Sequence, residues 1–188
     1  EILFCAKPLR CYADPSTYDD APLFDVLLPD GRFMSVVDIF KYLGSLISRM
    51  GSDAPDADSR IASAGKAFGA LSAYVFRSHS VTIAAKRRVY EGLILAILLY
   101  GSECWLVTEA MRQRLRAFHA QCVRAMSGVT RTRSWQERIS TWELAQALGR
   151  ESIDIDLERR RLRYLGHVAR MPFERTPRRM LSSWVAAP

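Results

Sequence analysis

A row of basic side chains recurs about once per helical turn near the end of the chain. Its members are Arg160, Arg163, His167 and Arg170. Intervals of three and four residues place side chains on one side of an α-helix. Such a row can follow the phosphates of a nucleic acid and bind it whatever its sequence. The alternative is a solvated helix face paired with acidic neighbours. Those neighbours are Asp154, Asp156 and Glu158.

Other basic side chains are candidates for phosphate contacts. They are Lys66, Lys86, Arg87, Arg131 and Arg133. Arg131 and Arg133 lie close to Trp135, and proteins that bind single-stranded nucleic acid combine cations with aromatic rings in this way. Lys86 and Arg87 are expected on the polar side of a helix. In a separate segment, Lys41 and Tyr42 precede Gly44, which lets another backbone approach a tight turn closely.

Two acidic clusters near the start of the chain could bind metal ions. They are Tyr12-Ala13-Asp14 and Tyr18-Asp19-Asp20. Paired carboxylates can hold the two metal ions that catalyse phosphoryl transfer. Pro15 stands where the first cluster would need a second acid, and the second cluster sits in a proline-bounded loop. We therefore interpret both as polar surface and predict no catalytic or metal-binding residue in this chain.

Four side chains are of the types that bind zinc, but their spacing does not match that of a known zinc site. The four are Cys104, His119, Cys122 and His167. Only His119 and Cys122 are close in the sequence, and the paired cysteine spacing of structural zinc sites is missing. A buried cysteine is usually a small apolar side chain. We predict no cofactor.

Charge is distributed unevenly along the 188 residues, whose net charge is +7. Residues 109–188 hold sixteen arginines, no lysine and eight acidic residues. The arginine fork suits phosphate, so this half favours a nucleic-acid partner. Four cysteines without a CxxC pair favour reduced thiols in a nuclear or cytoplasmic protein. No signal peptide is recognisable at Glu1, which is not an initiator, so we expect the chain to begin inside a longer reading frame.

The stretch Val81–Trp105 is predicted to be the central buried helix. Ser80 or Thr82 can cap its start, and Gly101 can end it. Residues 92–100 are apolar on every side, which is typical of a helix inside a bundle. The run is far shorter than the roughly 20 residues of a membrane span, so we predict no membrane partner.

The other elements follow from hydrophobic periodicity and turn residues. We expect a hairpin between residues 24–28 and 32–37 around Pro29-Asp30-Gly31, and an extended segment over residues 38–48. Helices are expected after residue 56, from Thr108 to Gly128, over residues 141–148 and from Ser152 or Asp154 to Met171. Residues 129–140 are expected to form a basic loop, and residues 172–188 a loosely held tail.

Five stretches in order carry a family resemblance. They are Phe40-Lys41-Tyr42-Leu43-Gly44-Ser45, Arg60-Ile61 with Ala67-Phe68-x-x-Leu71, Lys86-x-x-Val89-Tyr90, Leu98-Leu99-Tyr100-Gly101-Ser102-Glu103-x-Trp105, and Arg163-Tyr164-Leu165-Gly166-His167-Val168-x-Arg170-Met171. Together they resemble the downstream part of reverse transcriptases of non-LTR retrotransposons, over nearly the whole chain.

The resemblance implies a division into three regions. Residues 1–48 correspond to the end of the palm and the primer grip, with Lys41, Tyr42 and Gly44 in the grip. Residues 49–128 correspond to a helical thumb, and residues 129–188 to a basic helical connector and tail. The catalytic carboxylates of the family precede this region, so Mg²⁺ is implied only for the whole parent enzyme.

We therefore expect an α+β chain that is predominantly α-helical, with a small β-hairpin region before the helices. The expected function is to bind an RNA template and a DNA primer, or their hybrid, beside the fingers and palm of the parent polymerase. The chain is not expected to be an enzyme by itself. Two alternatives remain: a degenerate helical module that binds proteins, and a self-standing metal enzyme that uses Asp14, Asp19 and Asp20.

Overall fold

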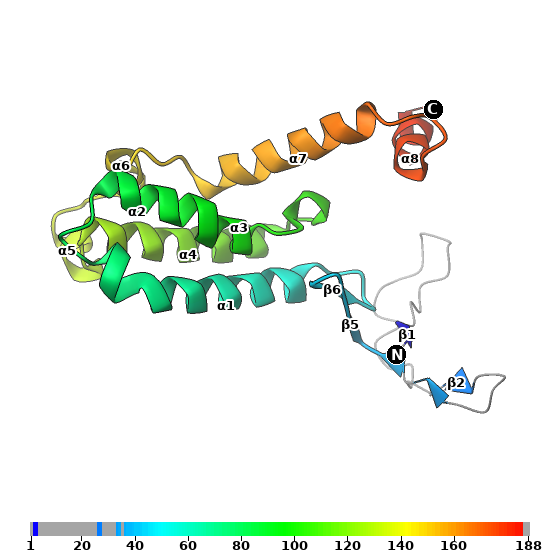
Figure 1. Cartoon of the computed structure of the whole chain (residues 1–188), viewed down its shortest axis with the longest axis horizontal. Coiled ribbons are helices and arrows are strands. Elements are labelled where there is room, and N and C mark those ends of the chain that lie inside the picture. The colour runs from blue at the N-terminus through cyan, green and yellow to red at the C-terminus, as the bar shows by residue number, and fades with distance from the viewer. Residues whose placement is uncertain (1, 4–25, 28–32, 35, 186–188) are drawn as a thin grey trace. The chain divides into compact units, whose positions relative to one another are not determined.

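A computed structural model describes residues 2–3, 26–27, 33–34 and 36–185 of the chain (Figure 1). The protein is α+β and mostly helical, with strands before helices, as the sequence predicts. It folds as two compact units, residues 1–59 and residues 60–188. All the described strands lie in the first unit, where α1 also begins.

Short strands form three two-stranded ladders in the first unit. They are β1 (Ile2–Leu3), β2 (Val26–Leu27), β3 (Phe33–Met34), β4 (Val36–Val37), β5 (Ile39–Tyr42) and β6 (Ser45–Ser48). β1 runs parallel to β4, whereas β2 and β3 are antiparallel. The β2–β3 ladder confirms the first predicted hairpin. Its turn, Pro29-Asp30-Gly31, lies outside the described residues, as do Asp14, Asp19 and Asp20.

A second hairpin occupies residues 38–48, where the prediction of one extended segment is wrong. β5 and β6 pair from Ile39 with Ser48 to Tyr42 with Ser45. The two residues between the strands, Leu43 and Gly44, have φ angles of 46° and 87°. A two-residue turn with positive φ at both positions matches the twist of a hairpin. A leucine in the first position is an unusual turn residue, so the pattern concealed the reversal.

The base of this hairpin is held by polar contacts. The backbone N–H of Arg49 donates to the carbonyl of Asp38 over 2.8 Å, and Arg49 Nε lies 3.0 Å from Asp38 Oδ1. The backbone N–H of Leu46 donates to Asp56 Oδ1 over 2.9 Å. Strand β6 is therefore attached to the first turn of α1.

The helical elements follow in sequence order. They are α1 (Ala54–Leu71), the π-helical turn η2 (Ser72–Phe76), α2 (Ile83–Val89), the π-helical turn η3 (Tyr90–Ile94), α3 (Leu95–Leu98), the 3₁₀ turn η4 (Ser102–Cys104), α4 (Glu109–Ser127), α5 (Arg131–Gln136), α6 (Thr141–Ala147), α7 (Ile153–Ala169) and α8 (Thr176–Val185). Several starts and ends follow the predicted signals. Thr82, Thr108 and Ser152 accept backbone N–H groups as N-caps, and Gly101 and Gly128 adopt the left-handed conformation at helix ends.

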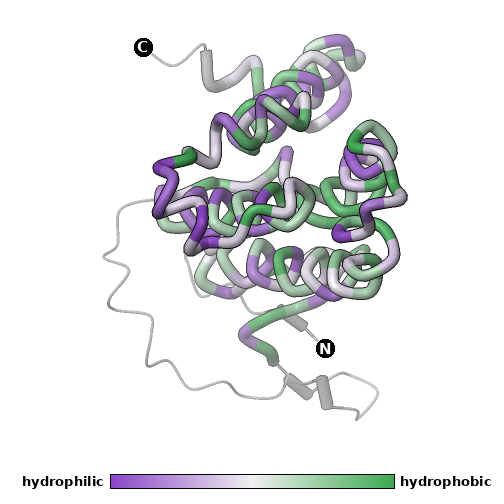
Figure 2. The backbone as a smooth tube through the Cα atoms, turned by 90° about the vertical axis from the view of Figure 1, so that its left-hand side faces the viewer, coloured by the Kyte–Doolittle hydropathy of each residue, from purple (hydrophilic) through white to green (hydrophobic). Residues whose placement is uncertain are grey.

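The core of the second unit combines side chains from most of its helices. Its largest fully buried members are Phe76, Tyr90, Ile94, Leu98, Leu99, Met111, Leu115, Ile153 and Leu157. Helix α4 contacts both α6 and α7, and α7 contacts η4 and α8. Polar and apolar residues alternate along these helices, as Figure 2 shows. Apolar stripes of helical period therefore meet in one core.

The central helix is less buried than the sequence predicts. Ile94, Leu95, Leu98 and Leu99 are buried, but Leu93 is 42% exposed and lies on the opposite side. The π-helical turn η3 interrupts the α-helix at the start of this run, where the N–H of Leu95 donates to the carbonyl of Tyr90. The prediction of an apolar rod buried on all sides is therefore wrong.

Two segments predicted to be irregular are helical instead. In the expected basic loop, Thr130 caps α5 by accepting the N–H of Arg133 over 3.2 Å. In the expected tail, α8 begins at Thr176. Pro177 suits its first turn, because a proline there removes an N–H that would have no partner within the helix. Both predictions of irregular structure are wrong.

Two side chains of the hypothetical zinc site belong to the core. His119 is 5% exposed, and its Nδ1 lies 2.8 Å from the hydroxyl oxygen of Tyr90. Burial and the nearby Arg150 lower the pKa of His119 to about 4. Its ring is therefore neutral at neutral pH. Burial also raises the pKa of Cys122 to about 12.

None of the described helices is long and apolar enough to cross a membrane.

Candidate nucleic-acid interface

The tip of the β5–β6 hairpin presents the predicted primer-grip residues together. Lys41, Tyr42, Leu43 and Gly44 are all exposed, and the Tyr42 side chain is 57% exposed. The Phe40 ring stacks against the Tyr42 ring, with 6.5 Å between their centroids. One short turn therefore carries a cation, an aromatic ring and an accessible backbone.

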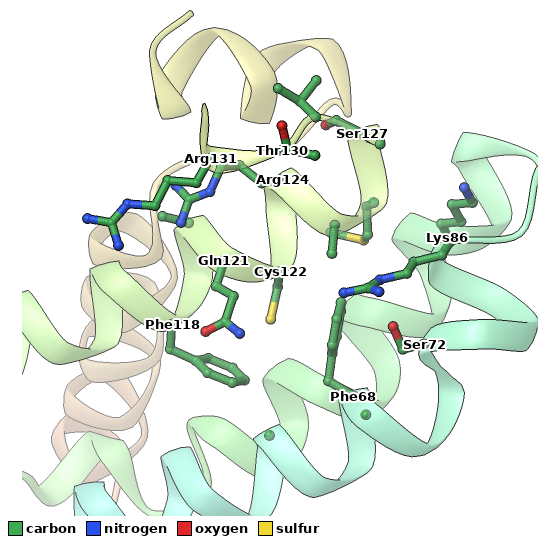
Figure 3. A pocket seen from close by; sticks show the side chains of 18 of the residues that line it. Phe68, Ser72, Lys86, Phe118, Gln121, Cys122, Arg124, Ser127, Thr130 and Arg131 are labelled. Atoms are coloured by element: carbon green, nitrogen blue, oxygen red, sulfur yellow. The ribbon is translucent and has the colours of Figure 1, made fainter. Parts of the chain in front are cut away.

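A groove of about 1390 Å³ opens on the second unit (Figure 3). It is lined by the second half of α1, the segment that leads into α2, the second half of α4 and the start of α5. Small residues leave this space open. Gly65 and Gly69 line it from α1, and a Cβ atom built on Gly69 would meet nothing within 4 Å.

Basic side chains surround the groove. They are Arg77, His79, Lys86, Arg124 and Arg131, and no described residue that lines the groove is acidic. None of these five side chains makes a hydrogen bond or ion pair with another described residue. An anion in the groove would therefore meet several cations and no competing carboxylate.

Lys86 is the most deeply placed of these cations. The sequence predicted it on the wet side of its helix, but it is only 7% exposed, so this prediction of exposure is wrong. Lys86 lies on the side of α2 that faces the groove. A buried ammonium group is costly unless a negative charge or hydrogen-bond acceptor compensates it. No described residue that lines the groove is negatively charged, and a phosphate would supply a negative charge beside Lys86.

Of the four basic side chains in the predicted row on α7, one is hydrogen-bonded within the protein and three are not. Arg160 is half-buried, and its Nη1 donates to the carbonyl of Leu99 over 3.1 Å. The side chains of Arg163, His167 and Arg170 are exposed, and none of these side chains has a hydrogen bond or ion pair with a described residue.

The remaining predicted cations lie on three different helices. Lys66 is exposed on α1, next to the groove residue Gly65. Arg87 Nε lies 3.9 Å from Glu91 Oε1, and Arg133 Nε lies 2.8 Å from Glu137 Oε1. Of the predicted set, only Lys86 and Arg131 line the groove.

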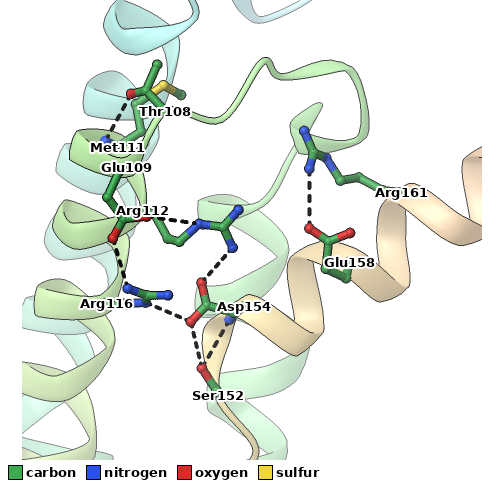
Figure 4. Close-up of polar contacts among 9 residues, drawn as sticks. All are labelled: Thr108, Glu109, Met111, Arg112, Arg116, Ser152, Asp154, Glu158 and Arg161. Carbon is green, nitrogen blue, oxygen red and sulfur yellow. Dashed lines mark hydrogen bonds and ion pairs between the residues drawn. The ribbon is translucent and has the colours of Figure 1, made fainter.

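Part of the arginine excess holds the fold together (Figure 4). Asp154 at the start of α7 accepts Nη1 of Arg112 over 3.0 Å and Nε of Arg116 over 2.8 Å, both from α4. Ser152 Oγ donates to the same carboxylate over 2.9 Å. Burial acts to raise the pKa of Asp154, but these hydrogen bonds outweigh it and lower that pKa. The carboxylate is therefore an ionised anchor between α4 and α7.

Other arginines bind carbonyls and carboxylates of distant segments. Arg150 pairs with Glu91 over 2.8 Å and also with Asp156. Arg161 Nη2 donates to the carbonyl of Trp105 over 2.7 Å. These side chains are not available to a ligand in this arrangement.

Sequence reasoning missed three cations of the groove, Arg77, His79 and Arg124. Arg77 and His79 lie in the segment between η2 and α2, whereas Arg124 comes from α4, far along the chain, and only the packing of the helices brings them to one groove. A run or helical row of charges would have been detectable, but these residues form neither. No metal cluster of three His, Cys, Asp or Glu side chains occurs among the residues that the structure describes.

The chain is 29% identical over 163 residues to an uncharacterized transposon-derived protein of Caenorhabditis elegans. The match covers 84% of this chain and 54% of that protein, so the chain spans about half the length of its relative. No protein-family model matches the chain, and no solved structure matches it significantly. The similarity supports a transposon origin.

Proposed function

We propose that the chain is the template–primer-binding part of a reverse transcriptase of a non-LTR retrotransposon. Two observations of sequence support the family: the five ordered stretches that resemble these enzymes, and the similarity to a transposon-derived protein. The observation that carries the binding function is the groove with five basic side chains and no acidic one among its described residues.

Phosphate is the ligand chemistry that fits this groove best. Arginine binds phosphate with a planar fork of donors, and lysine binds it as a point charge. The groove is also larger than the roughly 300–1,000 Å³ of sites for small molecules. The phosphate backbone of a nucleic acid therefore fits the groove better than a single small anion.

The tip of the β5–β6 hairpin is the second surface of the chain that is proposed to contact nucleic acid. In the proposed assignment, Lys41, Tyr42 and Gly44 hold the primer, as they would in the family that the sequence resembles. The family that the sequence resembles has its catalytic carboxylates before this region, so the proposal assigns this chain no catalytic step. Primer extension by the chain alone would overturn that assignment.

Salt dependence of binding tests the proposal. The purified chain is titrated with an RNA–DNA hybrid at several salt concentrations, and the slope of log K against log salt is measured. Each phosphate contact contributes about −0.9 to that slope for a duplex. The variant Arg77→Gln/Arg124→Gln/Arg131→Gln is expected to bind more weakly and with a shallower slope.

A matched triple variant controls for net charge. Arg88, Arg175 and Arg179 are exposed, lie outside the groove and have no side-chain partner among the described residues. Changing these three to glutamine removes the same charge and is expected to leave the affinity and slope close to those of the unchanged chain. Equal losses in both triple variants, or no salt-dependent binding at all, would refute the groove as the binding site.

A protein-binding role is the competing candidate. A second groove, of about 540 Å³, lies between α7 and α8 and is lined by Leu162, Leu165, Val168 and Met180. Leu162 and Met180 are each 65% exposed. A chain that binds no hybrid at low salt would favour this apolar groove as its functional surface.

A further inference from the structure

A large aromatic side chain lies exposed beside the basic groove. Trp135 on α5 is 81% exposed. It follows Arg131 by four residues, and Arg131 lines the groove. Side chains four residues apart on a helix are neighbours, with roughly 5–6 Å between their Cβ atoms. A ligand in the Arg131 end of the groove is therefore within reach of the indole ring.

The other charges on this helix do not compete for that ligand. Arg133 Nε is paired with Glu137 Oε1 over 2.8 Å, so this cation and this carboxylate largely neutralise each other. Arg131 has no hydrogen bond or ion pair with another described residue. The exposed end of α5 therefore offers one open guanidinium and one open indole.

We propose that the Arg131 end of the groove binds single-stranded nucleic acid, with one unpaired base stacked on Trp135. The inference rests on the proposed function and names the form of nucleic acid that this end of the site takes: the unpaired stretch adjoining a hybrid. It assigns Trp135 a direct ligand contact that the family resemblance does not supply.

Stacking explains why the ligand is single-stranded. In a duplex, both faces of an internal base are covered by its neighbours, so an indole cannot reach them. An unpaired base offers a free π-face, and every base has one, so such contacts tolerate any sequence. Arg131 supplies the phosphate contact and Trp135 the stacking contact.

Two hybrids separate this inference from the proposed function. One is a blunt RNA–DNA hybrid, and the other carries a single-stranded RNA overhang of about six nucleotides. Removal of a base–aromatic stack typically lowers affinity by about tenfold or more. The unchanged chain is expected to bind the overhang hybrid about tenfold more tightly than the blunt one, with quenching of tryptophan fluorescence.

Tryptophan variants identify the ring responsible. Trp135→Ala is expected to remove the preference for the overhang and to leave the blunt-hybrid affinity unchanged, whereas Trp135→Phe retains a ring and part of the preference. Trp142→Ala is the matched control, because Trp142 is 63% exposed and lies on α6, not on the helix that carries Arg131. It is expected to behave like the unchanged chain.

The outcomes distinguish the two proposals. Salt-dependent binding to both hybrids with no preference for the overhang overturns the stacking site and leaves the proposed function standing. A preference that survives in Trp135→Ala, or is lost equally in Trp142→Ala, overturns the stacking site as well. Absence of salt-dependent binding to either hybrid overturns the proposed function itself.

Discussion

Replacing Arg160 by glutamine is expected to destabilise the fold, although this residue belongs to the row predicted to bind phosphate. The half-buried guanidinium donates to the carbonyl of Leu99 over 3.1 Å. Leu99 ends α3, and its carbonyl points out of the last helical turn. A cation at that position is stabilised both by the hydrogen bond and by the helix dipole.

The size of the loss follows from the partners that remain. A hydrogen bond to a charged group contributes about 1.5–3 kcal/mol. The Leu99 carbonyl would still accept the hydroxyl of Ser102 over 2.8 Å and the backbone N–H of Ser102 over 3.2 Å. Because the acceptor keeps these two partners, we expect the lower end of that range, about 1.5 kcal/mol.

Urea unfolding followed by circular dichroism measures this loss. With a slope of about 2 kcal/mol per molar urea, the unfolding midpoint should fall by about 0.7 M. Arg163→Gln is the control, because Arg163 is exposed on the same helix and has no hydrogen bond or ion pair with a described residue. Its midpoint should not change. Equal midpoints for the two variants, with a larger loss of hybrid affinity in Arg160→Gln, would show that Arg160 serves the ligand and refute the reasoning.

Three further predictions concern acid stability, the core and the thiols. The pKa of Asp154 is lowered in the folded chain, so its carboxylate stabilises the fold fully above the unfolded pKa of about 3.9. That contribution disappears as the pH falls through the lower, folded pKa. Asp154→Asn should therefore lose stability at pH 7 and much less at pH 2, as unfolding at the two pH values would measure. Phe76→Ala, which empties a fully buried site, should cost about 3–5 kcal/mol in urea unfolding, whereas Tyr74→Ala at an 82% exposed site should cost less than about 0.5 kcal/mol. Iodoacetamide should modify the exposed Cys104 in the folded chain and reach the buried Cys122, whose pKa is raised to about 12, only after unfolding; mass spectrometry of the peptides would contradict this if both were modified at the same rate.

Local signals in the sequence predicted the helix boundaries well. Thr108 caps α4 and Ser152 caps α7, because a capping hydrogen bond involves only residues two or three positions away. Gly128 ends α4 with φ of 69°, a conformation that glycine adopts without steric cost. The alternating pattern around Pro29-Asp30-Gly31 likewise predicted the first hairpin.

Contacts between distant segments could not be predicted in this way. Arg112 and Asp154 are 42 residues apart in sequence, and Arg160 lies 61 residues from Leu99. A count of arginines therefore overstates the charge left for a ligand, because it cannot show which arginines are already bonded. The groove has the same origin, since its cations meet only after α1, α2 and α4 have packed.

The π-helical turn η3 has a consequence for how insertions and deletions act on this chain. One residue of an α-helix occupies about 100° around the axis, and a π turn holds one residue more than the α turn it replaces. Deleting a single residue from Tyr90–Ile94 would convert the π turn into an ordinary α turn and leave the helix after it at nearly the same rotational phase. Leu98 and Leu99 would then still face the core, whereas the same deletion within α2 or α3 would rotate the residues after it by about 100°. This short stretch is therefore where the helix can lose one residue at the least cost.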